Sequence, residues 1–137
     1  MTIGGETVLV VEDNDRNMKL LRDVLQATGY RTLEASTGRQ ALLLAKHRPD
    51  LILMDVRLPD MDGLEALRMV RADARTASIP VVAVTAQAMK GDRERFLQAG
   101  FDGYLPKPLD VDELLAAVDQ HCGRAHVAAG SGADTRI

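Results

Sequence analysis

The chain has 137 residues, of which 46% are hydrophobic and 27% are charged, and this composition predicts one globular domain with a core of its own. The formal net charge of -3 argues against direct binding to nucleic acid, because phosphate-dominated binding needs a basic face. The single cysteine, Cys122, cannot form an internal disulfide, and no apolar run approaches the ~20 residues that span a bilayer, so we expect a cytoplasmic protein that does not insert into membranes.

Five short segments rich in Val, Ile and Leu predict strands. In chain order they are 7–11 (TVLVV), 31–35 (RTLEA), 51–54 (LILM), 80–84 (PVVAV) and 103–105 (GYL). Most of these segments do not alternate apolar with polar residues, as expected of strands that are buried on both faces of a sheet.

Helical periodicity appears between and after the predicted strands. Apolar residues recur three or four positions apart in several segments, which include Met18, Leu21 and Leu25; Ala41, Leu44 and Ala45; Leu64, Leu67 and Val70; and Val111, Leu114, Leu115 and Val118. Gly29 follows the first helical segment, and Gly100 follows the fourth, which lies between the predicted strands 80–84 and 103–105. A left-handed residue commonly ends a helix at such positions. Asp110 with Glu113 resembles a capping box at the start of the last helix.

This alternation of strands and helices predicts an α/β domain, in which a doubly wound parallel sheet carries helices on both faces. Residues 1–122 would form the domain. Residues 123–137 are small, polar and aperiodic, so we expect a disordered C-terminal tail there.

Polar residues gather where the predicted strands end, which is the edge of such a sheet that binds ligands. They are two adjacent acids, a third acid, a hydroxyl and a cation: Glu12, Asp13, Asp55, Thr85 and Lys107. Carboxylates about 4 Å apart repel by roughly 4 kcal/mol at an effective dielectric of 20, so positive charge must share the site. Lys107 supplies part of it, and Mg²⁺ is a divalent ion that carboxylate, carbonyl and water oxygens hold. Asp55 could then act as a nucleophile toward a phosphoryl group, with Thr85 and Lys107 holding the transferred oxygens.

The segments VVEDN, LILMDVRLPDMDG, VVAVTAQA and YLPKP together resemble the receiver domain of bacterial response regulators, the CheY-like family, over roughly residues 7–121. Within the family, the sequence is most similar to DivK-type single-domain regulators and to receivers of hybrid kinases. The resemblance implies a flavodoxin-like sheet of five strands in the order 2-1-3-4-5 with five helices. It also implies a two-component protein that takes a phosphoryl group from a histidine kinase or a histidine phosphotransfer protein.

The resemblance assigns the acceptor and the metal ligands. Asp55 would accept the phosphoryl group, and Asp13 and Asp55 would bind Mg²⁺ together with the backbone carbonyl of Arg57. Glu12 would act on the ion directly or through water. The side chains of Arg57 and Gln87 would flank the path of the hydrolytic water, so the lifetime of the phosphorylated state does not follow from the sequence.

The resemblance also assigns a switch. The hydroxyl of Thr85 would move toward the phosphoryl group, and Tyr104 would then turn inward. Lys107 would be the cation of the site, and the peptide bond before Pro108 would be cis, a form that is accessible almost only at proline.

Protein partners would bind at two surfaces by the same resemblance. The first helix would dock the histidine-bearing partner through Asn14, Asn17, Met18 and Leu21. A downstream protein target would bind the fourth helix, the fifth strand and the fifth helix, since phosphorylation would change this surface.

Asp60 and Asp62 follow Pro59 closely, so we expect both side chains to bond to backbone groups within their own turn. We do not expect them to bind a ligand.

Two other functions are alternatives at this stage. One is a receiver-fold module that binds partners constitutively and is rarely phosphorylated. The other, less favoured, is a phosphatase that forms an aspartyl-phosphate, because enzymes of the haloacid-dehalogenase type carry DxD on the first strand and this chain has EDN at 12–14. Walker A and GxGxxG loops are also missing from the sequence. We therefore expect a signalling protein that supports only its own phosphorylation and dephosphorylation.

Overall fold

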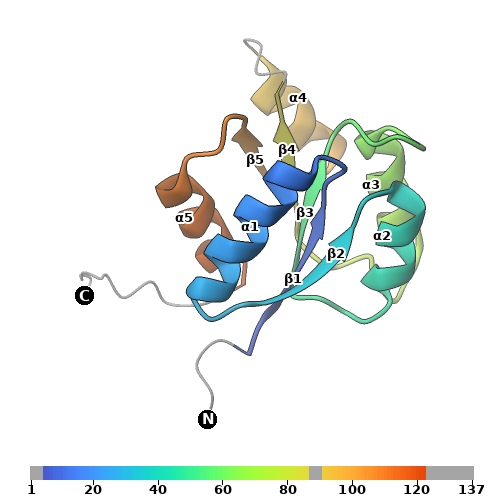
Figure 1. Cartoon of the computed structure of the whole chain (residues 1–137). Helices are drawn as coiled ribbons and strands as arrows, with labels where there is room; N and C mark the ends of the chain where they lie inside the picture. The colour runs from blue at the N-terminus through green and yellow to red at the C-terminus, as the bar shows by residue number, and fades with distance from the viewer. Residues whose placement is uncertain (1–4, 87–90, 123–137) are drawn as a thin grey trace.

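A computed structural model describes residues 5–86 and 91–122, which form five strands and five helices in strict alternation (Figure 1). The elements are β1 (Thr7–Val11), α1 (Asp15–Ala27), β2 (Arg31–Ala35), α2 (Gly38–Ala45), β3 (Leu51–Asp55), α3 (Gly63–Ala72), β4 (Val81–Thr85), α4 (Asp92–Ala99), β5 (Gly103–Pro106) and α5 (Val111–His121). The strands are all parallel and lie in the order β2-β1-β3-β4-β5. The predicted doubly wound α/β fold is confirmed, whereas the predicted tail at 123–137 and Gln87 lie outside the described residues.

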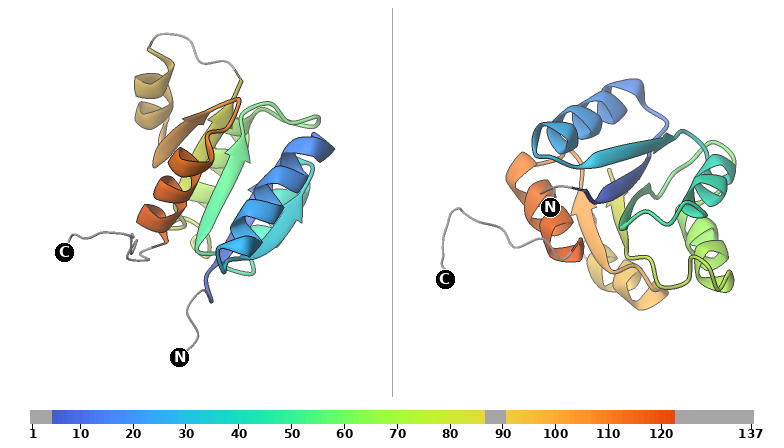
Figure 2. Two further views of the ribbon diagram at one scale, coloured as in Figure 1. Left: turned by 60° about the vertical axis from the view of Figure 1, so that its left-hand side comes forward. Right: turned by 90° about the horizontal axis from the view of Figure 1, so that it is seen from below.

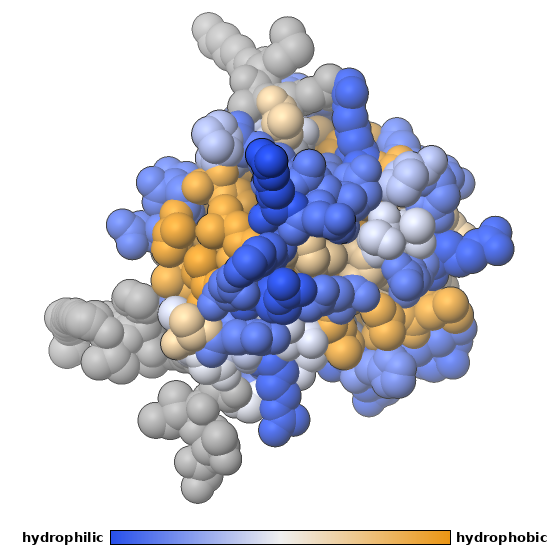
Figure 3. Space-filling model, in the orientation of Figure 1, coloured by the Kyte–Doolittle hydropathy of each residue, from blue (hydrophilic) through white to orange (hydrophobic). Residues whose placement is uncertain are grey.

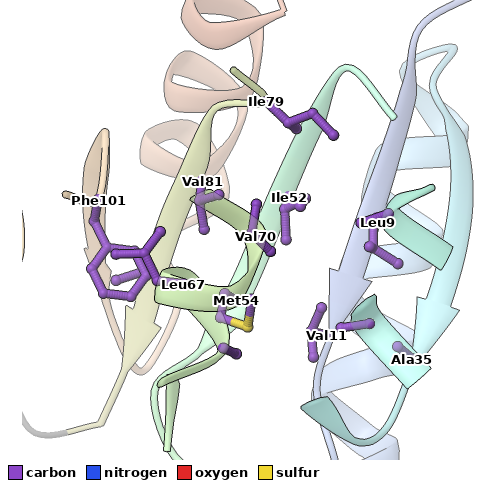
Figure 4. Close-up of a cluster of buried hydrophobic side chains, with 14 of the residues drawn as sticks. Leu9, Val11, Ala35, Ile52, Met54, Leu67, Val70, Ile79, Val81 and Phe101 are labelled. Atoms are coloured by element: carbon purple, nitrogen blue, oxygen red, sulfur yellow. The ribbon is translucent and has the colours of Figure 1, made fainter. Parts of the chain in front are cut away.

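Helices cover both faces of the sheet, as the two views of Figure 2 show: α1 and α5 lie on one face, and α2, α3 and α4 on the other. Strand residues alternate between the two cores. In β1, Val8 and Val10 face α1 and α5, whereas Leu9 and Val11 join the cluster on the opposite face (Figure 4). Because both faces are covered, the central strands read as continuous apolar runs, which is why the sequence shows no alternation there.

Side chains that precede the helices fix where four of them begin. Each cap accepts a hydrogen bond from a backbone N–H of the first turn, and these caps are Asn14, Thr37, Asp62 and Asp110. The predicted cap at Asp110 is thus confirmed, with its carboxylate 3.0 Å from the backbone nitrogen of Glu113. In contrast, Gly91 precedes α4, and this left-handed residue with φ 90° has no side chain to cap the helix.

The register of the parallel strands brings their carboxyl ends to one edge of the sheet, toward the top of Figure 1. Val11 lies beside Met54, Asp55 beside Val84, and Thr85 beside Pro106. Side chains alternate along a strand, so Asp55 points to the face that carries α1 and α5 and Thr85 to the face that carries α4.

Within the described ranges, no helix has the length and apolar character that crossing a membrane requires.

Candidate functional site

The predicted polar residues of the strand ends meet in a cleft of about 320 Å³. It is lined by Glu12, Asp13, Asn14, Asn17, Asp55, Arg57, Thr85, Ala86 and Lys107. Loops, strand ends and the first turn of α1, which are far apart in the sequence, therefore form one concave surface.

Three carboxylates form the acidic part of the cleft. Glu12 and Asp55 are buried, with 2% and 6% of their surface exposed, and Asp13 is exposed at the rim. One oxygen from each carboxylate lies within 4.8 Å of the others, close enough for a single cation to contact all three. Hard carboxylate oxygens in this arrangement fit Mg²⁺ or Ca²⁺ better than metals that prefer nitrogen or sulfur.

Lys107 brings a positive charge into the same cleft. Its Nζ lies 2.8 Å from Oε1 of Glu12 and 3.1 Å from Oδ2 of Asp55, and only 15% of its side chain is exposed. The backbone supports this position, because the N–H of Lys107 donates to the carbonyl of Thr85 at 2.8 Å and the Lys107–Pro108 peptide bond is cis.

Burial and pairing shift the pKa values of Glu12 and Lys107. Burial raises the pKa of Glu12, although the bonds from Lys107 and from the N–H of Asn14 oppose that rise. Burial lowers the pKa of Lys107, but its contacts with Glu12 and Asp55 together outweigh burial and leave the pKa above its ordinary value. The lysine is therefore a permanent cation at neutral pH.

The loop after Asp55 turns tightly back over the strand end. The N–H of Arg57 donates to Oδ1 of Asp55 at 3.0 Å, and the N–H of Gly63 donates to the carbonyl of Val56 at 2.7 Å. A Cβ at Gly63 would lie 2.7 Å from Cα of Val56, so only glycine allows this close approach. The side chain of Arg57 is exposed and lines the cleft.

Thr85 and Tyr104 lie on the α4 side of the sheet. Thr85 is 2% exposed, and Tyr104 sits beside Ala83 in the register of β4 and β5. The ring of Tyr104 stacks on Phe96 of α4, with centroids 5.7 Å apart and an interplanar angle of 20°. Among the described residues its buried hydroxyl has no hydrogen-bond partner, and burial, followed by the negative charge of Asp92, raises its pKa.

The predicted docking residues of α1 do not all reach the surface. Asn14 is exposed, and Asn17 and Met18 are half-buried beside it. Leu21 is only 1% exposed and packs in the core under α1 and α5, so it supports the helix rather than offering a contact. Leu21 belongs to the apolar stripe of α1, and such a stripe faces the core. The predicted docking role of Leu21 is therefore wrong.

The prediction for Asp62 is confirmed and that for Asp60 is wrong. Asp62 caps α3 by accepting from the N–H of Leu64 at 2.6 Å. Asp60 instead accepts from the N–H groups of Gly38 and Arg39, which begin α2. No local pattern in the sequence reveals this bond, because it joins residues 22 and 21 positions apart.

Comparison with known families gives a match over nearly the whole described chain: residues 8–119 match the response regulator receiver domain. Among curated proteins, the chain is 47% identical over 121 residues to the polar-differentiation response regulator DivK of Brucella anthropi, which covers 88% of this chain and 98% of that protein. The DivK of Brucella melitensis is 46% identical with the same coverage.

Solved structures of receiver domains are similar as well. The receiver domain of the sensor histidine kinase PA1611 from Pseudomonas aeruginosa, solved with a magnesium ion in its active-site cleft, is 41% identical with a TM-score of 0.80 and covers 88% of this chain and 99% of that one. A response regulator from Chloroflexus aurantiacus is 33% identical with a TM-score of 0.82 and the same coverage.

Proposed function

Because the chain belongs to the response regulator receiver family, we propose that it accepts a phosphoryl group on Asp55 from a histidine kinase or a histidine phosphotransfer protein, with Mg²⁺, and signals through phosphorylation-dependent binding to other proteins. One observation carries the proposal: Asp55 shares a cleft with two further carboxylates, a half-buried lysine and a buried threonine. A carboxylate that served only as a helix cap or a loop residue would not need these neighbours.

The residues fit a magnesium ion. The carboxylates of Glu12, Asp13 and Asp55 would hold it, with the backbone carbonyl of Arg57 as a further ligand. When bound, the ion offsets the negative charge of the carboxylates and of the incoming phosphoryl oxygens.

The reacting groups belong to the chain itself. A carboxylate oxygen of Asp55 would form a bond to phosphorus while the bond from phosphorus to the histidine nitrogen of the donor breaks. The electron pair of that bond stays on the donor imidazole, which takes up a proton. Lys107 already touches Asp55 at 3.1 Å, so its ammonium group would bind a transferred oxygen without moving far.

The signal would leave the site through α4. Phosphorylation adds about 1.5 to 2 negative charges beside Asp55, which would draw the hydroxyl of Thr85 toward them. Thr85 faces the same side of the sheet as Tyr104, and Tyr104 stacks on Phe96 of α4. A shift of Thr85 would therefore change the space around Tyr104 and the position of α4.

A second cleft would bind the downstream target. It measures about 540 Å³ and takes lining residues from α4, β5 and α5, among them Arg93, Tyr104 and Glu113. Tyr104 thus connects this cleft to the aromatic stack. We assign the downstream protein to this face.

The phosphoryl donor would dock at the other side of the site. Asn14 and Asn17 line the cleft of Asp55, and Met18 follows them on α1. Figure 3 shows apolar surface over α5, next to α1. Leu109 and Met18 are half-buried and pack against the core cluster under α1 and α5. A helical partner with an apolar face could bury this surface while its histidine reaches Asp55.

The test is incubation with acetyl phosphate and Mg²⁺, followed by mass spectrometry of the intact protein. We expect the native protein to gain about 80 Da, the mass of one phosphoryl group. Asp50→Asn, which changes another carboxylate next to β3, should gain the same mass, and Asp55→Asn should gain none. A gain that survives Asp55→Asn would exclude Asp55 as the acceptor.

The same protein preparations separate the alternatives. A partner captured by the native protein should bind more tightly after addition of beryllofluoride, and unchanged affinity would favour constitutive binding. Release of many equivalents of phosphate from several esters would favour a phosphatase.

A further inference from the structure

We propose that Asp60 is a positioning residue for the metal and acceptor site: its carboxylate ties the loop 56–62, which follows Asp55, to the amino end of α2. The inference rests on the proposed function, because it concerns the loop that would supply the carbonyl of Arg57 to Mg²⁺.

Asp60 uses both carboxylate oxygens for this tie. Oδ1 accepts from the N–H of Gly38 at 2.7 Å, and Oδ2 accepts from the N–H of Arg39 at 2.9 Å. Both donors belong to the first turn of α2, whose N–H groups have no partner within the helix. These two bonds lower the pKa of Asp60, so the carboxylate is charged at neutral pH.

An apolar contact lies directly beside the polar one. Met61 packs so closely on Gly38 that a Cβ there would lie 2.5 Å from Cγ and 2.6 Å from Sδ of the methionine. Gly38 is buried and Met61 is half-buried against the core. Two consecutive loop residues thus hold the same point of α2.

The rest of the loop has little freedom to absorb a movement at Asp60. At one end, the N–H of Arg57 is bonded to the carboxylate of Asp55. At the other end, the N–H of Gly63 is bonded to the carbonyl of Val56. Arg57 and Asp62 also pair across the loop as an antiparallel bridge. A displacement of Asp60 would therefore reach the backbone of Arg57 and the carboxylate of Asp55.

Two consequences follow from this arrangement. Loss of the Asp60 carboxylate should weaken Mg²⁺ binding by about threefold to tenfold, which is less than the 10–100-fold typical of groups that orient metal ligands directly, because Asp60 acts through the loop. Coupling between sites is reciprocal, so binding of Mg²⁺ should in turn protect the amides of Gly38 and Arg39 from hydrogen exchange.

A purely structural cap would behave differently. It would lower stability without changing the affinity for Mg²⁺, as measured on folded protein. Asp73 provides the matched control, because its carboxylate also accepts a backbone bond, from Arg75 at 2.9 Å, but it lies at the end of α3 and outside the cleft. Asp60→Asn keeps one acceptor oxygen and serves as the conservative variant.

The experiment is calorimetric titration of Mg²⁺ into the native protein, Asp60→Ala, Asp60→Asn and Asp73→Asn, at a temperature where all four are folded by circular dichroism. We expect the affinity to fall about threefold to tenfold in Asp60→Ala, to fall less in Asp60→Asn and to stay within about twofold in Asp73→Asn. Amide exchange measured by nuclear magnetic resonance should show Mg²⁺-dependent protection of Gly38 and Arg39 in the native protein.

The outcomes separate the two proposals. The role of Asp60 would be overturned, with the metal site left intact, by either of two results. One is equal Mg²⁺ affinity in the native protein and Asp60→Ala, and the other is amide hydrogen exchange at Gly38 and Arg39 that is the same with and without Mg²⁺. A native protein that binds no Mg²⁺ would overturn the metal site itself, and the role of Asp60 with it.

Discussion

The contacts of Lys107 predict how the site responds when its cation is removed. In Lys107→Ala, the buried carboxylates of Glu12 and Asp55 lose the ammonium group that lies 2.8 Å and 3.1 Å from them. Without Mg²⁺, nothing else in the described part of the cleft neutralises these charges, because Arg57 is exposed and bonds to Asp55 only through its backbone N–H. The metal-free variant should therefore be less stable than the native protein.

The size of the effect follows from the distances. Two unit charges 4.8 Å apart, the limit of separation in this cluster, repel by about 3.5 kcal/mol at an effective dielectric of 20. Asp13 is exposed and well solvated, so we count only the repulsion between Glu12 and Asp55. Partial relaxation and protonation of Glu12 would reduce the loss, and we expect about 2 to 3 kcal/mol in the free energy of unfolding.

The pH dependence has a defined sign. The pKa of Glu12 is already raised by burial, and the bond from Lys107 is the main influence that opposes this rise. Removal of the lysine therefore raises the pKa further, so the folded variant binds a proton more tightly than the unfolded chain does. Stability of the variant should rise as the pH falls through that pKa, and its deficit should be smaller at about pH 5 than at about pH 7.5.

Urea unfolding followed by circular dichroism measures these quantities, with and without Mg²⁺. We expect Mg²⁺ to restore more stability to Lys107→Ala than to the native protein, because the ion no longer competes with an ammonium group for the carboxylates. The control Arg93→Ala, at an exposed position of α4, should change neither the stability without Mg²⁺ nor the stabilisation by Mg²⁺. Equal stability of Lys107→Ala and the native protein in the absence of Mg²⁺, at both pH values, would refute the reasoning.

Three further variants test other parts of the structure. Arg71→Met should lower the free energy of unfolding, measured in urea, by about 2 kcal/mol, because the guanidinium of Arg71 bonds to three carbonyls and a carboxylate around α3 and α4. The control Arg68→Met, on the exposed face of α3, should change the free energy of unfolding by under about 0.5 kcal/mol. Gly63→Ala should cost about 1 to 3 kcal/mol in the same assay and weaken Mg²⁺ binding, because the added Cβ would lie 2.7 Å from Cα of Val56; unchanged values would show that the loop adapts. Asp73→Asn should lower the melting temperature slightly at neutral pH. The difference in melting temperature from the native protein should shrink as the pH falls from 3.8 toward about 2, the lowered pKa of the Asp73 carboxyl group. A difference that stays constant over this pH range would contradict the lowered pKa.

The fold could be predicted from the sequence because its signals are local. Apolar runs marked the strands, a spacing of three or four marked the helices, and the acids that close β1 and β3 marked the edge of the sheet. The strand order came from the family resemblance, since periodicity alone does not say which strands are neighbours. Given that order, Glu12, Asp55 and Lys107 had to meet, and their distances in the structure agree with that expectation.

The features that sequence reasoning missed depend on contacts between distant segments. The carboxylate of Asp60 bonds to α2, and Arg71 joins the end of α3 to the carbonyl of Gly100, which caps α4. Neither residue belongs to a short motif whose spacing indicates a partner. Leu21 is a different case, because the family resemblance assigned a docking role to a residue that lies in the apolar stripe that α1 buries.

The acidic cleft draws its groups from three segments of the chain, at residues 12–13, 55 and 107, which become neighbours only when β1, β3, β4 and β5 have assembled. In an unfolded chain these groups are far apart, so they cannot bind one divalent ion together. An ion that binds here would therefore act as a folding ligand, shifting the equilibrium toward the native state by an amount set by its concentration. The supply of magnesium would then govern both how much of the protein is folded and how much is ready to be phosphorylated.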